Sequence, residues 1–256
     1  MRPRAGTGKE VDLALAAFTL RVVSEKNMGF LKNIALLLLL AATVLCSARA
    51  AESFIIADAQ TGHILSSKNR DEKLPVASLT KIATAVVVLD WAKLKQSDLS
   101  LPVEISQSAL NAGGANPVGL QAGDSISLRD LIYCALLASD NVAATSLAEF
   151  VGSRLPNSSG LDPAGNFVSH MNALARSLGM TKTLFLNVSG FDGAESKAYP
   201  HSTAEDMARL TRYAYNVQGF PFYVAQASRQ VHVFRNGVDM PLDIQNTNEL
   251  LGRDGI

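Results

Sequence analysis

The 256-residue sequence has little cysteine, with Cys46 and Cys134 as its only thiols. A framework of several disulfides, of the kind that holds small secreted domains together, is therefore excluded. Net charge is absent too, because 23 basic and 23 acidic side chains balance. No run of Lys or Arg marks a basic surface, so there is no electrostatic basis for nucleic-acid binding. No residues show the spacing of a metal site, and no cofactor is expected.

Aromatic residues are also few, at 6% of the chain, whereas hydrophobic residues make up 48%. This composition suits one globular domain with a sizeable core and many small residues for close helix packing. Histidine is rare, and none of the four histidines has a neighbouring partner that suggests a His-based catalytic triad. They are His63, His170, His201 and His232.

One long apolar run, Ile34–Leu45, precedes Ala48-Arg49-Ala50, the small-x-small pattern of a signal peptidase site. We expect residues 28–50 to be a signal peptide that exports the protein to the periplasm or the extracytoplasmic face of the cell membrane. An uncleaved anchor is the alternative, although the run is short for a bilayer. Residues 1–27 precede a normal start at Met28 and are expected to be an upstream extension outside the fold.

The remaining residues, 51–256, read as strands followed by helices and a late strand. Residues 53–57 and 63–67 predict a hairpin, and Ser202-x-x-Glu205 is typical of a helix capping box. Further strands are expected at 103–105 and 230–234, and helices at 78–91, 128–137, 142–150, 167–178 and 207–215. This order predicts an α/β (α+β) fold whose first strands pair with strands from the C-terminal end.

The chemistry centres on Ser78 and Lys81, which begin a helix that is apolar on almost every side through Trp91. Pro75 suits the approach to a helix start, which places Ser78 in the first turn. Residues three apart lie on the same helix face, so the hydroxyl and the amine are neighbours. Burial at the positive end of a helix disfavours a protonated amine, which lets Lys81 act as a base toward Ser78. A chance Ser-x-x-Lys match is the alternative.

A second constellation, Ser139-Asp140-Asn141, lies at a break between two apolar helices. Such a break can project a hydroxyl and an amide into a cleft, where Ser139 would relay a proton and Asn141 would orient a substrate amide. The same three residues are also good helix caps, so a purely structural role remains open. The loop Asn111–Pro117 is either the rim of this cleft or a plain surface loop.

Together, Ser78-x-x-Lys81 and Ser139-x-Asn141 resemble the signature of the penicillin-recognising serine enzymes. Within that β-lactamase/DD-peptidase superfamily, the chain resembles the D-alanyl-D-alanine carboxypeptidases, which are low-molecular-weight penicillin-binding proteins. The resemblance covers nearly all of residues 52–256. It extends through Asp58–Gly62, Leu74–Lys81, Phe167–Asn172, Leu178–Thr183, Ser202–Asp206 and Asn246–Leu251.

This resemblance implies a β-lactamase/DD-peptidase-like fold, with an antiparallel sheet flanked by helices and an all-helical subdomain. It implies acyl transfer, in which Ser78 attacks peptidoglycan stem peptides ending in D-Ala-D-Ala and Lys81 is the general base. Ser139 would relay the proton and Asn141 would orient the substrate. β-Lactam antibiotics would be covalent inhibitors, and no cofactor is implied.

Three departures from the family pattern matter. Asp140 stands where the family usually has glycine, and Val142-Ala143 replaces the usual Asp-Ala. The third family motif, Lys-Thr-Gly, does not occur. We therefore expect 51–256 to be an incomplete domain that lacks C-terminal strands and is inactive by itself. Membrane association through a segment beyond Ile256 is left open.

Two other functions stay open at this point. A class A β-lactamase is favoured by Asp140, but those enzymes need a Glu-x-x-Leu-Asn sequence, and none follows Asn141. The other alternative is a non-catalytic protein that binds peptidoglycan or β-lactams, because the third motif is absent.

Overall fold

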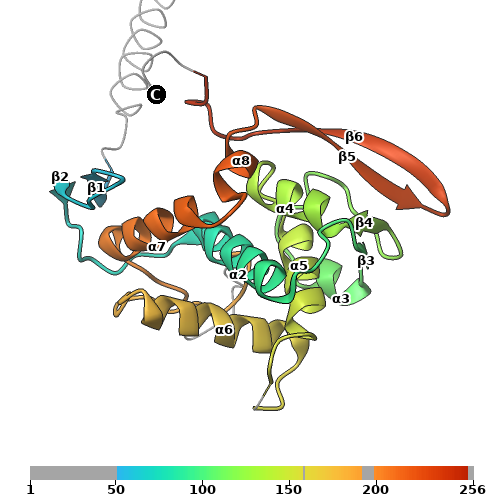
Figure 1. Cartoon of the computed structure of the whole chain (residues 1–256), viewed down its shortest axis with the longest axis horizontal. Coiled ribbons are helices and arrows are strands. Elements are labelled where there is room, and N and C mark those ends of the chain that lie inside the picture. The colour runs from blue at the N-terminus through green and yellow to red at the C-terminus, as the bar shows by residue number, and fades with distance from the viewer. Residues whose placement is uncertain (1–50, 158, 192–198, 253–256) are drawn as a thin grey trace, which may run out of the picture. The chain divides into compact units, whose positions relative to one another are not determined.

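The computed structural model describes residues 51–157, 159–191 and 199–252, and from Glu52 these residues form one compact unit (Figure 1). The expected upstream extension, 1–27, and signal peptide, 28–50, lie outside the described residues. None of the helices in the described ranges is long and apolar enough to cross a membrane.

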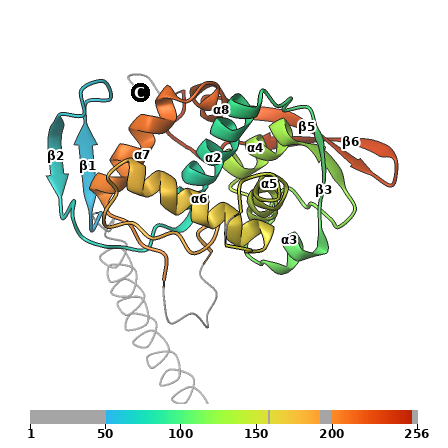
Figure 2. The same cartoon turned by 60° about the horizontal axis from the view of Figure 1, so that its bottom comes forward.

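Helix α2 (Thr80–Lys95) lies at the centre of the helical part, as Figures 1 and 2 show. Its apolar residues point in all directions, and eleven of its sixteen residues are buried, which is the pattern of a fully packed core helix. The predicted buried helix is therefore confirmed, with one adjustment at its start. Ser78 lies in a short 3-10 turn, η1 (Ala77–Leu79), immediately before the first residue of α2. Helices that contact α2 are α4 (Leu128–Leu136), α5 (Asn141–Gly152), α6 (Pro163–Ser177), α7 (Ala204–Asn216) and the short α8 (Phe220–Val224).

The strands form two antiparallel sheets. β1 (Phe54–Ala57) and β2 (Ile64–Lys68) make the predicted hairpin. A four-stranded sheet has the order β3-β4-β5-β6. Its members are β3 (Pro102–Glu104), β4 (Ser125–Ser127), β5 (Ser228–Arg235) and β6 (Val238–Gln245), and the short α3 (Gln107–Asn111) follows β3. The predicted combination of antiparallel strands and helices is confirmed.

The expected pairing of the first strands with strands from the C-terminal end does not occur with β5 or β6. Within the described ranges, β1 and β2 pair only with each other, whereas β5 pairs with β4 and β6. The reason lies in the turn between β5 and β6, where Asn236 and Gly237 both have positive φ, at 53° and 79°. An Asn-Gly pair with this backbone favours a tight two-residue hairpin, so β5 folds back on its immediate successor.

Side-chain caps fix where the helices begin. Ser127 caps α4 as predicted, because its Oγ accepts a hydrogen bond from the Asp130 N–H. The predicted Ser202-x-x-Glu205 box is wrong by one residue, since Thr203 caps α7 by accepting from the Asp206 N–H. Ser202 is unable to cap because its backbone pairs with Leu74 in an isolated bridge.

Candidate active site

The amine of Lys81 lies at the meeting point of three segments of the chain. Its Nζ is 3.2 Å from Ser78 Oγ and 3.3 Å from Ser139 Oγ. A third contact, of 3.1 Å, joins it to the backbone carbonyl of Ser189. An ammonium group has three donors and no acceptor, so three oxygen partners satisfy it completely. The structure thus brings together the two serines that the sequence placed in separate motifs.

Burial changes the proton affinity of this amine. Lys81 is only 2% exposed, and loss of hydration lowers its pKa from 10.5 to about 8, against the opposing influence of the Asp140 charge. A base with a pKa near neutrality holds a substantial neutral fraction under physiological conditions. Lys81 is therefore chemically able to accept a proton from the Ser78 hydroxyl.

The Ser139-Asp140-Asn141 break serves both as a cap and as part of the site. Asp140 caps α5, with its carboxylate 2.9 Å from the Ala143 nitrogen and 3.2 Å from the Val118 nitrogen. Burial raises the pKa of Asp140, whereas the hydrogen bonds from these backbone donors lower it by a smaller amount. Because Asp140 does the capping, the Ser139 side chain is left to contact Lys81. Ser139 also has a positive φ of 57°, an uncommon backbone conformation that is often found at functional sites.

Asn141 is buried at the start of α5, beneath the Asn111–Pro117 loop. Its backbone N–H donates to the carbonyl of Ala115 at 2.9 Å. A β-carbon added at Gly114 would lie 1.7 Å from Nδ2 of the Asn141 amide, so the loop backbone approaches that side chain closely. The loop is thus part of the site's surroundings. Within the described residues, no hydrogen bond joins the Asn141 side chain to Lys81.

Sequence reasoning missed the loop Asn187–Phe191, which supplies the third contact of Lys81. The Asn187 side chain accepts hydrogen bonds from the Ser189 and Gly190 nitrogens at 3.1 and 2.6 Å. One helical turn beyond Lys81, the Thr84 hydroxyl donates to the Val188 carbonyl at 2.6 Å. Two successive carbonyls of the loop are therefore held by α2.

Gly190 explains how the loop approaches the Ser78 turn so closely. It has a positive φ of 77°, and a β-carbon there would lie 1.8 Å from the Ala77 carbonyl oxygen. Only glycine fits this close approach. The Asn187-x-Ser189-Gly190 sequence is a recognisable turn pattern, but nothing in it identifies a lysine partner 108 positions earlier.

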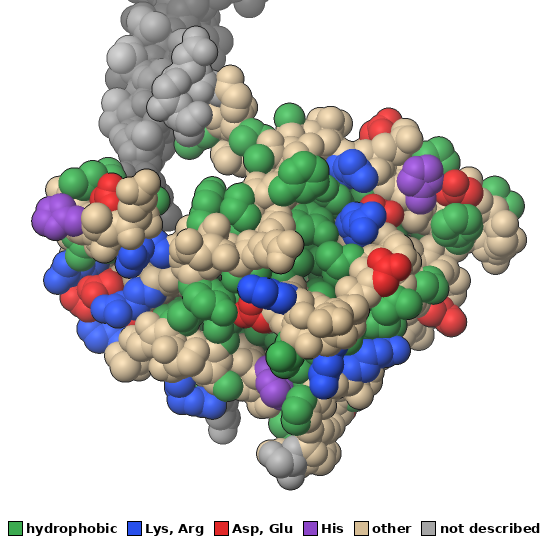
Figure 3. All heavy atoms as spheres, viewed as in Figure 1, with side chains coloured by type: hydrophobic (Ala, Val, Ile, Leu, Met, Phe, Trp, Pro, Cys, Tyr) green, Lys and Arg blue, Asp and Glu red, His purple; other side chains and the backbone are tan. Residues whose placement is uncertain are grey.

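A cavity of about 510 Å³ opens beside the two serines and Lys81. Its opposite wall is mostly apolar and comes from α2, α4, α7 and α8. Hydrophobic side chains also gather in the middle of the face seen in Figure 3, over these helices. The apolar lining residues include Ile82, Leu136, Tyr215, Phe220 and Val224, and Asn246–Asn248 close one end. A reactive polar cluster facing an apolar wall is the usual character of a ligand site.

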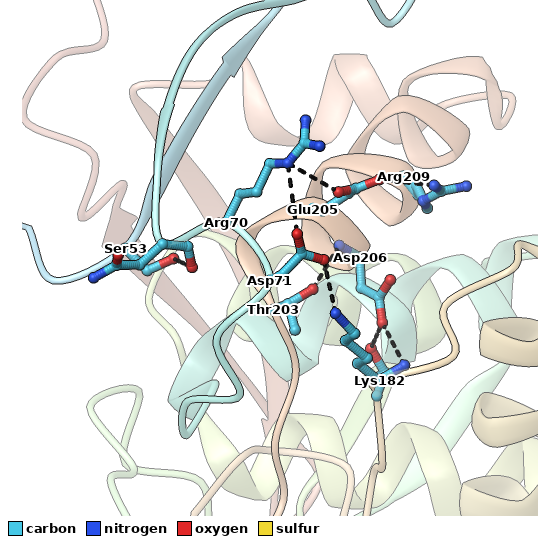
Figure 4. A network of polar contacts seen from close by, with 10 residues as sticks. Ser53, Arg70, Asp71, Lys182, Thr203, Glu205, Asp206 and Arg209 are labelled. Atoms are coloured by element: carbon cyan, nitrogen blue, oxygen red, sulfur yellow. Dashed lines mark hydrogen bonds and ion pairs between the residues drawn. The ribbon is translucent and has the colours of Figure 1, made fainter.

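The segment that leads into Ser78 is held near the start of α7 by backbone pairing and by ion pairs between side chains. Leu74 pairs with Ser202, and Leu184 pairs with His201. Figure 4 shows Lys182 between Asp71 and the first turn of α7, with the Asp71 contact at 2.8 Å. Exposed ion pairs contribute only about 0–1 kcal/mol, so the Leu74–Ser202 bridge dominates the positioning of this segment.

One buried carboxylate strengthens the same junction. Asp206 accepts from the Lys182 backbone nitrogen at 2.9 Å and from the Thr183 hydroxyl at 2.8 Å. Arg70 and Arg209 flank it through ion pairs to Glu205 at 3.4 and 2.9 Å (Figure 4). The segments that continue to Ser78 and to Ser189 are therefore tied to one another before they reach Lys81.

The histidines have other partners. His170 and His201 hydrogen-bond to backbone carbonyls, and His232 lies 3.0 Å from the Asp239 carboxylate. None of these partners is a serine. Within residues 51–157, 159–191 and 199–252, no group of three or more His, Cys, Asp and Glu residues could hold a metal ion.

The chain is similar in sequence to proteins that act as D-alanyl-D-alanine peptidases. The chain is 38% identical over 163 residues to a D-alanyl-D-alanine endopeptidase of Pseudomonas aeruginosa, covering 63% of this chain and 46% of the relative. It is 29% identical over 216 residues to the D-alanyl-D-alanine carboxypeptidase DacF of Bacillus subtilis, covering 82% and 50%. The chain thus spans about half the length of these curated relatives.

Solved structures show the same likeness. A mutant of the Streptomyces K15 DD-transpeptidase superimposes with a TM-score of 0.70 and 27% identity, covering 80% of this chain and 77% of the other. The carboxypeptidase DacD of Francisella tularensis gives a TM-score of 0.63 and 29% identity, covering 77% and 44%. Residues 41–256 match the family described as D-alanyl-D-alanine carboxypeptidase. This protein therefore belongs to that family, Peptidase_S11.

Proposed function

We propose that the protein is a serine-type D-Ala-D-Ala carboxypeptidase that acts on peptidoglycan stem peptides during cell-wall biosynthesis and remodelling. The observation that carries this proposal is the buried Lys81 amine in contact with both Ser78 and Ser139. Family membership supports the same reaction class. The relatives named above are DD-peptidases rather than β-lactamases, and Asp140 has a capping role that accounts for its presence.

In the proposed reaction, neutral Lys81 accepts the Ser78 proton while Ser78 Oγ attacks the carbonyl of the terminal D-Ala-D-Ala bond. The neutral amine keeps two donors, for the Ser139 hydroxyl and the Ser189 carbonyl, and turns its lone pair toward Ser78. Ser139 then relays the proton to the departing D-alanine nitrogen. Water hydrolyses the acyl-enzyme, with Lys81 again accepting a proton.

Asn141 would orient the substrate through its side-chain amide. The backbone N–H of Ser78 would stabilise the oxyanion of the tetrahedral intermediate, an interaction worth about 3–4 kcal/mol for each donor. β-Lactams would acylate Ser78 in the same way, which makes the protein a penicillin-binding protein.

We further propose that the protein is exported and works in the periplasm or at the extracytoplasmic face of the membrane. The apolar run Ile34–Leu45 and the following Ala48-Arg49-Ala50 support export, and peptidoglycan as substrate requires it. Membrane association remains a separate proposal, to be checked by fractionating cells that express the whole protein.

The test is release of D-alanine from a pentapeptide that ends in D-Ala-D-Ala, with the whole exported protein. We expect release by the wild type, none by Ser78→Ala, and wild-type release by Ser66→Ala, which changes an exposed serine of β2. A cross-linked stem-peptide dimer, assayed in parallel, tests endopeptidase activity. Equal turnover by wild type and Ser78→Ala would refute the proposal.

A further inference from the structure

Phe191 is a large apolar side chain that stays 45% exposed although it belongs to the loop that contacts Lys81. Its backbone is fixed at both polar atoms. The carbonyl accepts from the Asn187 side chain at 2.8 Å, and the nitrogen donates to Ser189 Oγ at 3.3 Å. Phe191 directly follows Gly190, which lies against the Ala77 carbonyl next to Ser78. The backbone of Phe191 is therefore held at a set place in the loop that contacts Lys81.

The Phe191 ring packs on two glycines of the Asn111–Pro117 loop, Gly113 and Gly114, which are called its seat below. β-Carbons added at Gly113 and Gly114 would each lie 3.2 Å from ring atoms of Phe191, so the ring packs on bare backbone. The β-carbon at Gly114 would also meet the Asn141 amide. Gly114 thus borders both the Phe191 ring and the Asn141 amide, which is proposed to hold the substrate.

The glycine loop is itself fixed relative to Asn141. The Asn141 nitrogen donates to the Ala115 carbonyl, and the Val118 nitrogen donates to the buried carboxylate of Asp140. These two hydrogen bonds come from adjacent residues of one motif. The loop that carries the seat of the Phe191 ring is therefore held against the start of α5, where Asn141 lies.

We propose that the exposed face of Phe191 is an apolar platform for the acyl donor, which makes Phe191 a specificity-determining residue. The platform takes the apolar group attached to the substrate amide that Asn141 orients. This inference rests on the proposed function and adds to it the chemistry of the neighbouring subsite. The favoured acyl donor carries an aliphatic or aromatic group next to its amide, and a donor that lacks such a group is disfavoured.

An aromatic face is suited to this role. It offers a flat apolar surface that excludes water from one side of the amide, and an aromatic group that stacks on it gains about 0.5–1.5 kcal/mol beyond the area that it buries. Because the seat consists of two glycines, the ring packs directly on backbone, where β-carbons would crowd it. Gly114 also keeps the Asn141 amide free of a β-carbon.

The test compares two β-lactams that differ in whether one nitrogen carries an acyl group. Benzylpenicillin carries a phenylacetylamino side chain, and 6-aminopenicillanic acid carries an amino group at the same atom. Second-order acylation rate constants are measured for the whole protein by mass spectrometry of the intact acyl-enzyme. We expect Phe191→Ala to lower the ratio of the two constants about fivefold, in line with the loss of one aromatic contact. Phe191→Leu, which keeps an apolar group, should give an intermediate ratio.

Phe234→Ala is the matched control, because Phe234 is equally exposed, at 48%, but lies on β5. It should leave the ratio unchanged, and thermal unfolding checks that all three variants fold. An unchanged ratio in Phe191→Ala and Phe191→Leu would overturn the inference, as would equal loss of both rate constants. If neither compound acylates the wild type, the proposed function fails first, so the two failures are distinguishable.

Discussion

The rate at which a penicillin acylates the protein should rise with pH and level off above the pKa of Lys81. Only the neutral amine can accept the Ser78 proton, so the rate follows the neutral fraction. With a pKa of about 8, about a tenth of the amine is neutral at pH 7 and about nine tenths at pH 9. The acylation rate constant should therefore increase about tenfold over this interval. A lysine with the ordinary pKa of 10.5 would be neutral in only about one molecule in three thousand at pH 7.

The assay is acylation by a fluorescent penicillin, measured at short times between pH 6 and pH 10 so that hydrolysis of the β-lactam stays small. Lys81→Arg is the control, because arginine stays protonated throughout this range and has no acceptor. The penicillin should acylate this variant several orders of magnitude more slowly, and the rate should not rise with pH around pH 8. A wild-type profile that is flat, or whose midpoint lies at pH 10 or higher, would refute the reasoning about Lys81.

Two further changes test the surroundings of the site, and a third tests the buried ion pair between Arg235, at the end of β5, and Asp124, just before β4. Asp140→Asn should move the midpoint of the acylation profile to lower pH, by less than about one pH unit, because the Asp140 charge raises the pKa of Lys81; an unmoved midpoint in the same assay would contradict this coupling. Gly190→Ala should lower the free energy of unfolding by about 2–4 kcal/mol, measured in urea, because its β-carbon collides with a backbone carbonyl; wild-type stability would disprove the close approach. Arg235→Met should cost about 3–5 kcal/mol at pH 7 by leaving the buried Asp124 carboxylate unpaired. The pKa of Asp124 is lowered in the fold, so its pairing stabilises at neutral pH and is lost as the carboxyl protonates. The cost in urea unfolding should therefore shrink below about pH 4, and a constant cost would exclude this role.

The sequence was sufficient for features that depend on local spacing. Ser78 and Lys81 are three positions apart, and this spacing predicts their contact because one helical turn brings them together. The continuous apolar run after Lys81 identifies a buried helix for the same local reason. The approach of Ser139 to Lys81, across 58 positions, followed from family resemblance rather than from any periodicity.

Other features depend on contacts that leave little trace in the sequence. The Ser189 carbonyl belongs to the backbone, which every residue has, so no side-chain pattern marks it as a partner of Lys81. The exact start of α7 depended on competition, because Ser202 and Thr203 are both good caps and backbone pairing removed Ser202. The Asn236-Gly237 pair is a sequence signal for the late hairpin and therefore for its second strand, β6.

The most direct test of the central claim is to identify the atom that a β-lactam modifies. The whole protein is treated with benzylpenicillin, digested, and the modified peptide is sequenced by mass spectrometry. We expect one adduct, on the peptide that contains Ser78, and none in Ser78→Ala. An adduct on Ser139, or one that persists in Ser78→Ala, would show that the nucleophile has been assigned to the wrong residue.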